Sequence, residues 1–248
     1  MRTILLIFLL TSSRLLFAQE LSQLTEKVLV YEAVFILPNG DTLTKELIEL
    51  EFTSAPWAVK SQQELKINYF TDTVAIKNFI NPFEKRRKKY EKYQQKREEG
   101  KRGWENWTWL EKSEKTGYIL TDTSLWTHPP RGNQYLYNEL AGMPQIIFNQ
   151  LFVGGSWKEG ISIMMGWHDF KGVLESEYLV KGKTAYKRKE IDIAETWDIY
   201  VAHHHSELGE YHSKILFDYN KYGFIQFDNS FPDGHRMVTS LIQVKAKP

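Results

Sequence analysis

The sequence predicts a mainly β protein, an antiparallel meander curled into a half-barrel or barrel, with one charged helical insertion. The first observation is that stretches rich in Val, Ile, Phe, Tyr and Trp alternate with glycine-containing breaks from Gly155 to Val244. The second is that these breaks are only a few residues long, and such short connections join antiparallel neighbours. The third is that the strong helix signal is confined to residues 81–102.

The expected strands fall on both sides of this insertion. Before it we expect strands at 28–37, 42–52 and 64–70, the first two joined by a turn at residues 38–41, which read Pro-Asn-Gly-Asp. After the insertion, further strands are expected at residues 156–165, 173–181, 184–193, 195–205, 210–218, 222–229 and 235–244.

The insertion begins with residues typical of a helix start. Asn81 can cap the helix, Pro82 suits the first helical position, and Glu84 stands where a capping box needs a carboxylate. Residues 84–102 then hold ten Lys or Arg and four Glu, which favours a solvated helix and leaves an anionic partner as the alternative.

The N-terminal residues have the pattern of a cleaved signal peptide over residues 1–18. A basic start is followed by an apolar run from Ile4 to Leu10, and Ala18 is a small residue just before polar chain. The apolar run is too short to span a bilayer. We therefore expect one exported β domain over residues 19–248, periplasmic or secreted, with two β subdomains at 19–80 and 104–248 as the alternative.

Composition narrows the function classes. The chain has no cysteine, so the exported protein forms no disulfides and lacks a lipid-anchor cysteine. The formal net charge is +1, which gives no overall field for nucleic acid, and no later segment has the length and apolarity of a membrane helix. No glycine-rich phosphate loop or nucleophile elbow is present, so the sequence nominates no catalytic residue and no cofactor.

Histidines gather at one predicted hairpin. His203, His204 and His205 precede the expected loop Glu207-Leu208-Gly209, and His212 follows it, with Gly209 in a left-handed conformation. This register pairs Ser206 with Glu210, His204 with His212, and Val201 with Ile215. It places His203 and His205 on the apolar side of the sheet. The polar side then carries a weak candidate metal site made of His204, His212 and Glu210.

The apolar faces of the same two strands give a candidate ligand site. Alternation places one set of side chains inward, and these could line a cavity or fill a closed core. The candidate ligand-binding residues are Trp197, Ile199, Val201, Ile215 and Phe217.

The C-terminal half also carries a resemblance. Its aromatic and glycine positions include Trp157, Gly160, the run Tyr178 to Tyr186, the run Trp197 to Ala202, and Tyr222 to Phe224. Over residues 155–244 this pattern resembles exported bacterial half-barrel proteins of unassigned function, similar to the lipoprotein-carrier type. The resemblance implies a curled antiparallel sheet around an apolar cavity that suits acyl chains, and it transfers no binding residue.

Three functions follow as expectations. The first is a non-catalytic exported protein that binds an apolar or amphipathic ligand, such as a lipid, or assists envelope assembly. The second is a surface module that uses the basic helix with Trp104, Trp107 and Trp109 for glycan or protein contacts. The third is a hydrolase of unknown type.

Overall fold

The computed structural model of the chain describes residues 21, 23–71, 113–127, 145–163 and 172–247. The predicted leader at 1–18, the predicted helix at 81–102 and the three tryptophans that follow it lie outside these residues.

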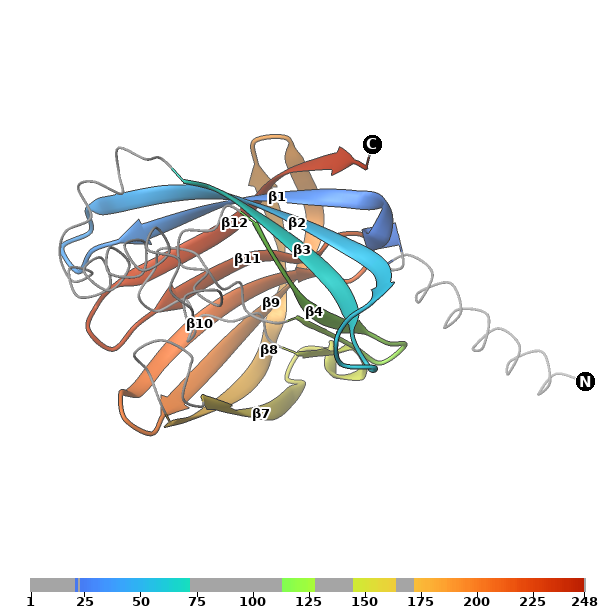
Figure 1. Cartoon of the computed structure of the whole chain (residues 1–248). Coiled ribbons are helices and arrows are strands. Elements are labelled where there is room, and N and C mark those ends of the chain that lie inside the picture. Colours follow the sequence, from blue (N-terminus) through green and yellow to red (C-terminus); the bar gives the residue numbers. More distant parts are fainter. Residues whose placement is uncertain (1–20, 22, 72–112, 128–144, 164–171, 248) are drawn as a thin grey trace, which may run out of the picture.

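Within the described residues, twelve antiparallel strands form one sheet that curls into a nearly closed barrel (Figure 1). Two short 3-10 helices, η1 (Gln23–Glu26) and η2 (Phe148–Gln150), accompany the strands. The strands are β1 (Lys27–Ile36), β2 (Thr42–Pro56), β3 (Gln63–Thr71), β4 (Ser113–Leu120), β5 (Ser124–Thr127), β6 (Ile146–Ile147), β7 (Ser156–Ile163), β8 (Gly172–Arg188), β9 (Ile191–His205), β10 (Gly209–Asp218), β11 (Gly223–Ser230) and β12 (Arg236–Ala246). The predicted fold class is therefore confirmed.

The strand order places the first and last strands side by side in the middle of the sheet. The order is β6-β5-β4-β3-β2-β1-β12-β11-β10-β9-β8-β7, so each half of the chain is a simple meander. The two meanders join where Lys27 of β1 pairs with Ala246 of β12 and Ile36 pairs with Arg236. The two edges of the described sheet, β6 and β7, are consecutive strands of the chain.

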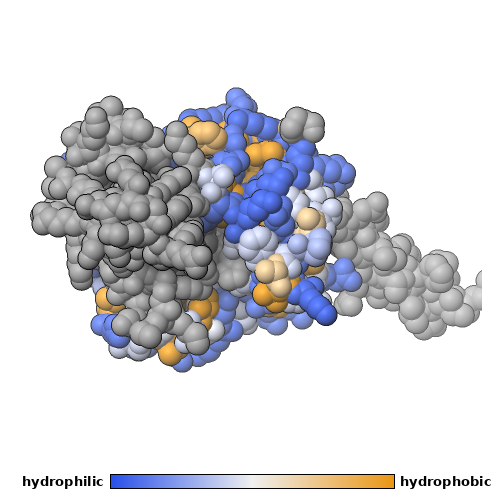
Figure 2. All heavy atoms as spheres, viewed as in Figure 1, coloured by the Kyte–Doolittle hydropathy of each residue, from blue (hydrophilic) through white to orange (hydrophobic). Residues whose placement is uncertain are grey.

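Alternating side chains fill the inside of the barrel. On β1, Leu29, Tyr31, Ala33 and Phe35 are buried, while the residues between them are mostly half-buried. The same period of two on the other strands adds to a single apolar cluster. On the face seen in Figure 2, the described surface is mainly hydrophilic, with hydrophobic side chains in small separate patches.

Two predicted strands, 173–181 and 184–193, are wrong as separate elements. The glycine at 182 does not end a strand, because the ladder with β9 absorbs it in a bulge between Val180 and Gly182. The turn comes later, at Lys189, which has a positive φ of 50°. The strands β8 and β9 are therefore 17 and 15 residues long.

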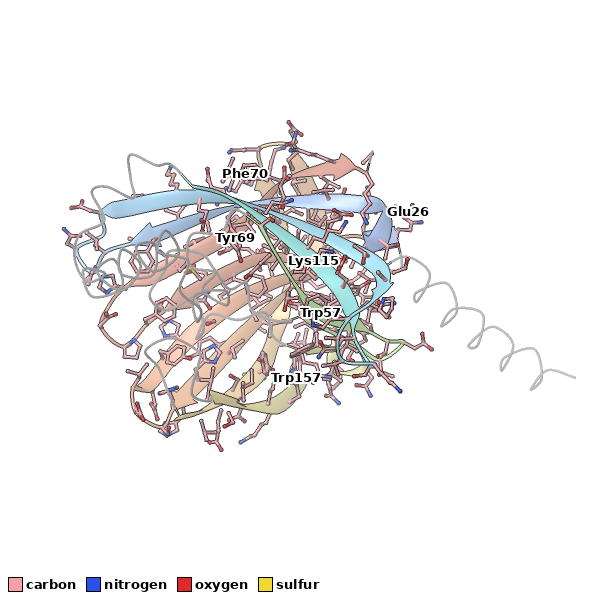
Figure 3. The ribbon with its side chains drawn as sticks, viewed as in Figure 1. Glu26, Trp57, Tyr69, Phe70, Lys115 and Trp157 are labelled. Atoms are coloured by element: carbon pink, nitrogen blue, oxygen red, sulfur yellow. The ribbon has the colours of Figure 1, made fainter. Side chains whose placement is uncertain are left out.

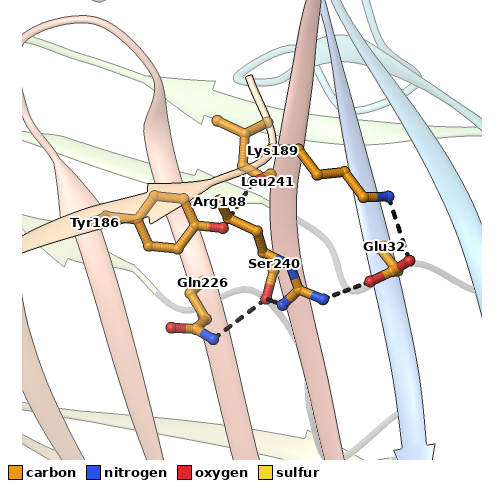
Figure 4. A network of polar contacts seen from close by, with 7 residues as sticks. All are labelled: Glu32, Tyr186, Arg188, Lys189, Gln226, Ser240 and Leu241. Carbon is orange, nitrogen blue, oxygen red and sulfur yellow. Dashed lines mark hydrogen bonds and ion pairs between the residues drawn. The ribbon is translucent and has the colours of Figure 1, made fainter. Parts of the chain in front are cut away.

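The far end of the β8–β9 hairpin is fixed to the middle of the sheet (Figure 4). The Tyr186 hydroxyl donates a hydrogen bond to the Leu241 carbonyl oxygen at 2.7 Å, and Arg188 donates to the Ser240 hydroxyl at 2.7 Å. Arg188 also forms an ion pair with Glu32 of β1. Burial alone would raise the pKa of Glu32, but its hydrogen bond from Arg188 and nearby positive charges hold that pKa below its usual value.

Replacing Arg188 with alanine should destabilise the protein by about 2 kcal/mol, because it leaves the largely buried Glu32 carboxylate without its main partner. The matched control is Lys187→Ala on the same hairpin, which removes an ion pair between two well-exposed side chains and should leave the free energy of unfolding almost unchanged. Urea unfolding of both variants measures the difference. Equal losses would mean that the hairpin is not fixed through Arg188.

Candidate functional site

The observed register of the β9–β10 hairpin differs from the predicted register by two residues. Gly209 has the expected positive φ of 80°, but it pairs with His205, so the loop is residues 206–208. The His205 ring explains this position, since its Nδ1 accepts hydrogen bonds from the backbone N–H groups of Glu207 and Leu208, both at 3.2 Å. The predicted pairing of His204 with His212 is wrong.

The observed pairs are His204 with Glu210, Ala202 with His212, and Val201 with Ser213. Because the error is an even number of residues, every side chain keeps its predicted face. His204, Glu210 and His212 are exposed, whereas His205 is fully buried.

A chain of hydrogen bonds crosses four strands inside the barrel. The Ser176 hydroxyl lies 2.8 Å from Nδ1 of His203, and Nε2 of His203 lies 2.8 Å from the Ser213 hydroxyl. Ser213 in turn donates to Oδ1 of Asn229 at 2.6 Å. The Tyr211 ring stacks on His203 with ring centroids 4.6 Å apart. We call Ser176, His203, Ser213 and Asn229 the inner polar chain.

The inner polar chain holds His203 in its neutral form. Burial, together with the neighbouring His212, lowers the pKa of His203 to about 3. Because Ser213 gives its proton to Asn229, Nε2 of His203 carries the proton donated to Ser213, and Nδ1 accepts from Ser176. Both ring nitrogens are thus used inside the barrel.

Within the described residues, β6 and β7 at the two edges of the sheet are linked through side chains and not through backbone pairing of the two strands. The Trp157 indole N–H of β7 donates to the Gln145 carbonyl oxygen at 2.9 Å, and the Gln145 N–H donates to Glu159 at 3.4 Å. Tyr178 donates to the same Glu159 oxygen at 2.9 Å, and burial raises its pKa well above the usual value. Trp157, labelled in Figure 3, stacks on Tyr178 with centroids 4.9 Å apart.

A cavity of about 710 Å³ lies over β7 to β10. We call it the outer hollow because most of its lining residues are exposed, although Ser176 and His203 of the inner polar chain also border it. Two cross-strand rows build it, Gly160-Glu175-His204-Glu210 and Lys158-Glu177-Ala202-His212. Gly160 and Ala202 have little or no side chain, so the surface is hollowed between their larger neighbours. The lining residues are Lys158, Glu159, Gly160, Glu175, Ser176, Glu177, Tyr200, Ala202, His203, His204, Glu210, Tyr211 and His212.

The outer hollow combines an aromatic wall with a polar rim. The Tyr200 and His212 rings lie nearly parallel with centroids 6.0 Å apart, and the Lys181 ammonium lies 5.4 Å from the Tyr200 ring centre. Lys158 forms an ion pair with Glu177 at 3.4 Å, between two exposed side chains. The rim therefore offers carboxylate acceptors, imidazoles and ammonium donors around one aromatic surface.

The candidate metal ligands share a face but do not converge. In the part of the chain that the structure describes, no group of three or more His, Asp or Glu side chains could hold a metal ion. The register explains this, because His212 stands beside Tyr200 instead of opposite His204. The predicted grouping of His204, His212 and Glu210 is not assembled.

The predicted ligand-binding side chains lie in the apolar core. Ile199, Val201, Ile215 and Phe217 are at most 2 % exposed, and the partly buried Trp197 packs against the same cluster. Ile215 faces Ile199 and Phe217 faces Trp197 across the hairpin. None of the five lines the outer hollow.

Sequence reasoning missed the inner polar chain and the hollow. A usable signal existed on β8, where Ser176 occupies an inward position between buried Leu174 and Tyr178. A polar side chain at an inward position needs a hydrogen-bond partner, which points to a polar neighbour on the next strand.

No protein-family model matches the chain, and no curated protein matches it. Similar solved structures include two bacterial proteins. One is a protein from Bacteroides fragilis, provisionally described as exported and with a YmcC-like fold; it has a TM-score of 0.40 and 10% identity, and the match covers 89% of this chain and 95% of that one. The other is a provisionally described lipoprotein from Parabacteroides distasonis, with a TM-score of 0.34, 8% identity and the same coverage. Among the described residues, no helix has the length and apolarity needed to cross a membrane.

Proposed function

We propose that this protein is an exported, non-catalytic binding protein that takes an amphipathic ligand in the outer hollow. The main support for this proposal is the hollow itself, which has a volume of about 710 Å³, an aromatic wall and a polar rim. Cavities of this size are typical of small-molecule sites. Export is supported by the charge, apolar run and small residue at the N-terminus.

An amphipathic ligand matches the lining. Tyr200 is 39 % exposed and gives a ligand one apolar surface. Exposed carboxylates and imidazoles surround it and suit hydroxyl, amide or amine groups. A ligand apolar on all sides would leave these groups without their water and without replacement partners.

A binding role without catalysis is supported by the position of the inner polar chain. His203 is half-buried, and both its ring nitrogens engage serines on the inward face. A general base needs a ring nitrogen that can take the substrate proton, and neither nitrogen of His203 is free to do so.

A ligand site inside the barrel is a second proposal. Its lining would be the core residues Trp197, Ile199, Val201, Ile215 and Phe217. A ligand there would have to displace packed side chains, since four of the five are almost fully buried.

Native mass spectrometry of protein purified from its host tests the proposal. The wild type should carry a small-molecule adduct, and Ala202→Trp should lose it, because the new ring fills the hollow. The matched control is Ala194→Trp, at an exposed position on the same strand outside the hollow, which should keep the adduct. An adduct retained by Ala202→Trp, or a wild type free of any adduct, would contradict the proposal.

A further inference from the structure

We infer that the ligand class of the outer hollow is a neutral saccharide, an inference that rests on the proposed binding function. The inference rests on two features that occur together in the hollow. One is the aromatic wall of Tyr200 and His212, and the other is the set of surrounding side chains that donate or accept hydrogen bonds. A sugar ring has an apolar C–H face and hydroxyl groups at its edges, and each hydroxyl can donate and accept.

An acyl chain fits the lining poorly. Burial stabilises a methylene group only when apolar surface surrounds it. The side chains that point into the hollow are mostly charged or imidazole, and Tyr200 and Ala202 are the apolar exceptions among the exposed lining residues. A long chain would therefore strip water from carboxylates without replacing their hydrogen bonds.

A ligand anion is disfavoured by the charge of the rim. Glu175, Glu177 and Glu210 are exposed in the hollow. The lysines at its rim are already engaged, because Lys158 pairs with Glu177 and Lys181 lies over the Tyr200 ring. Repulsion from the remaining carboxylates opposes a phosphate or carboxylate group in this space. A neutral hydroxyl meets the same carboxylates as a hydrogen-bond donor, which is favourable.

The position of the hydrogen-bonding groups suits a flat ring. Glu175 and Glu210 flank His204 directly across the strands, so three polar side chains form a line along one side of the hollow. The Tyr200 ring stands two rows away, paired with Lys214 and Leu179, and the row of Glu177, Ala202 and His212 lies between. A ring bound against Tyr200 would thus present its hydroxyl edge toward this line.

The inner polar chain stiffens this arrangement from behind. Ser176 lies between Glu175 and Glu177 in sequence, and His203 lies between Ala202 and His204. The partly buried hydrogen bond between Ser176 and His203 therefore fixes the backbone that carries both rows. A preformed site loses less conformational entropy on binding, which matters for saccharides because each contact is weak.

A nuclear magnetic resonance titration tests the inference, with maltose, cellobiose and N,N′-diacetylchitobiose as probes. At least one disaccharide should shift the imidazole signals of His204 and His212 and the ring signals of Tyr200, in a saturable way. Tyr200→Ala should weaken this binding roughly tenfold or more. The matched control is Phe70→Ala, an exposed aromatic ring on β3 away from the hollow, which should leave it unchanged.

The alternative outcomes separate this inference from the proposed function. Absence of saturable shifts with all three disaccharides would overturn the saccharide class. Shifts with phenethylamine in place of the sugars would overturn it as well, and would identify the hollow as a site for organic cations. In either case the adduct test with Ala202→Trp decides independently whether the hollow binds a ligand at all.

Discussion

Acidification from about pH 6.5 to about pH 4.5 should lower the free energy of unfolding by about 2 kcal/mol through His203 alone. Burial lowers the pKa of His203 to about 3 in the folded protein, against about 6.5 in the unfolded chain. Between these values the unfolded chain binds one more proton than the folded protein. The stabilisation is therefore complete above the unfolded pKa and is lost as the pH falls toward the folded one. Burial also lowers the pKa of His205, which adds a loss of the same sign.

The variant His203→Gln isolates this effect, because glutamine can hydrogen-bond to both serines but takes up no proton in this range. Urea unfolding at a series of pH values should give a flatter pH dependence for His203→Gln than for the wild type. Phe70→Ala, at an exposed position without a titratable group, should keep the wild-type slope. Parallel pH profiles for wild type and His203→Gln would show that His203 is not buried in its neutral form.

Truncating Phe217 to alanine should destabilise the protein by about 3–5 kcal/mol. Its ring is fully buried and packs edge-on against Phe224, with centroids 5.4 Å apart, and against Phe148 at 6.3 Å. The matched control is Phe152→Ala, where the ring is 53 % exposed and the change should stay within about 0.5 kcal/mol. Denaturant midpoints and slopes measure both.

The Phe217 result also tests the predicted interior ligand site. A filled core must lose transfer energy and gain a cavity when the ring is removed. A loss below about 1 kcal/mol would show that the ring borders a space that water or a ligand already fills, and would favour binding inside the barrel.

The fold could be predicted from the sequence because a period of two is a local signal. Leu29, Tyr31 and Phe35 alternate with less buried residues, and the Asn39-Gly40 turn closes the first hairpin where expected, with a φ of 90° at Gly40. The break expected at Gly182 failed because a glycine in a long strand can mark either a turn or a bulge, and the two look alike in one dimension.

The candidate site was harder to predict from the sequence than the fold, because the site depends on the register between strands. The outer hollow takes Gly160, Glu175, His204 and Glu210 from four different strands, and only the pairing brings them into one row. A shift of two residues at the His205 turn preserved the faces but changed every partner. The predicted faces of these side chains are therefore correct, whereas the predicted pairing of His204 with His212 is wrong.

The central pairing of β1 with β12 has a consequence for how the chain folds. Each meander can form from neighbours in sequence, but the two join only when strands some two hundred residues apart meet, with the Lys247 N–H bonded to the Glu26 carbonyl oxygen at 3.2 Å. Closing so long a loop is slow relative to forming hairpins. The two meanders should therefore form first and pair with each other last. A circular permutant that links residue 247 to residue 23 and has its new termini within residues 151–155 should fold faster. In this permutant β12 and β1 are consecutive in sequence, so their pairing requires only the formation of one more hairpin.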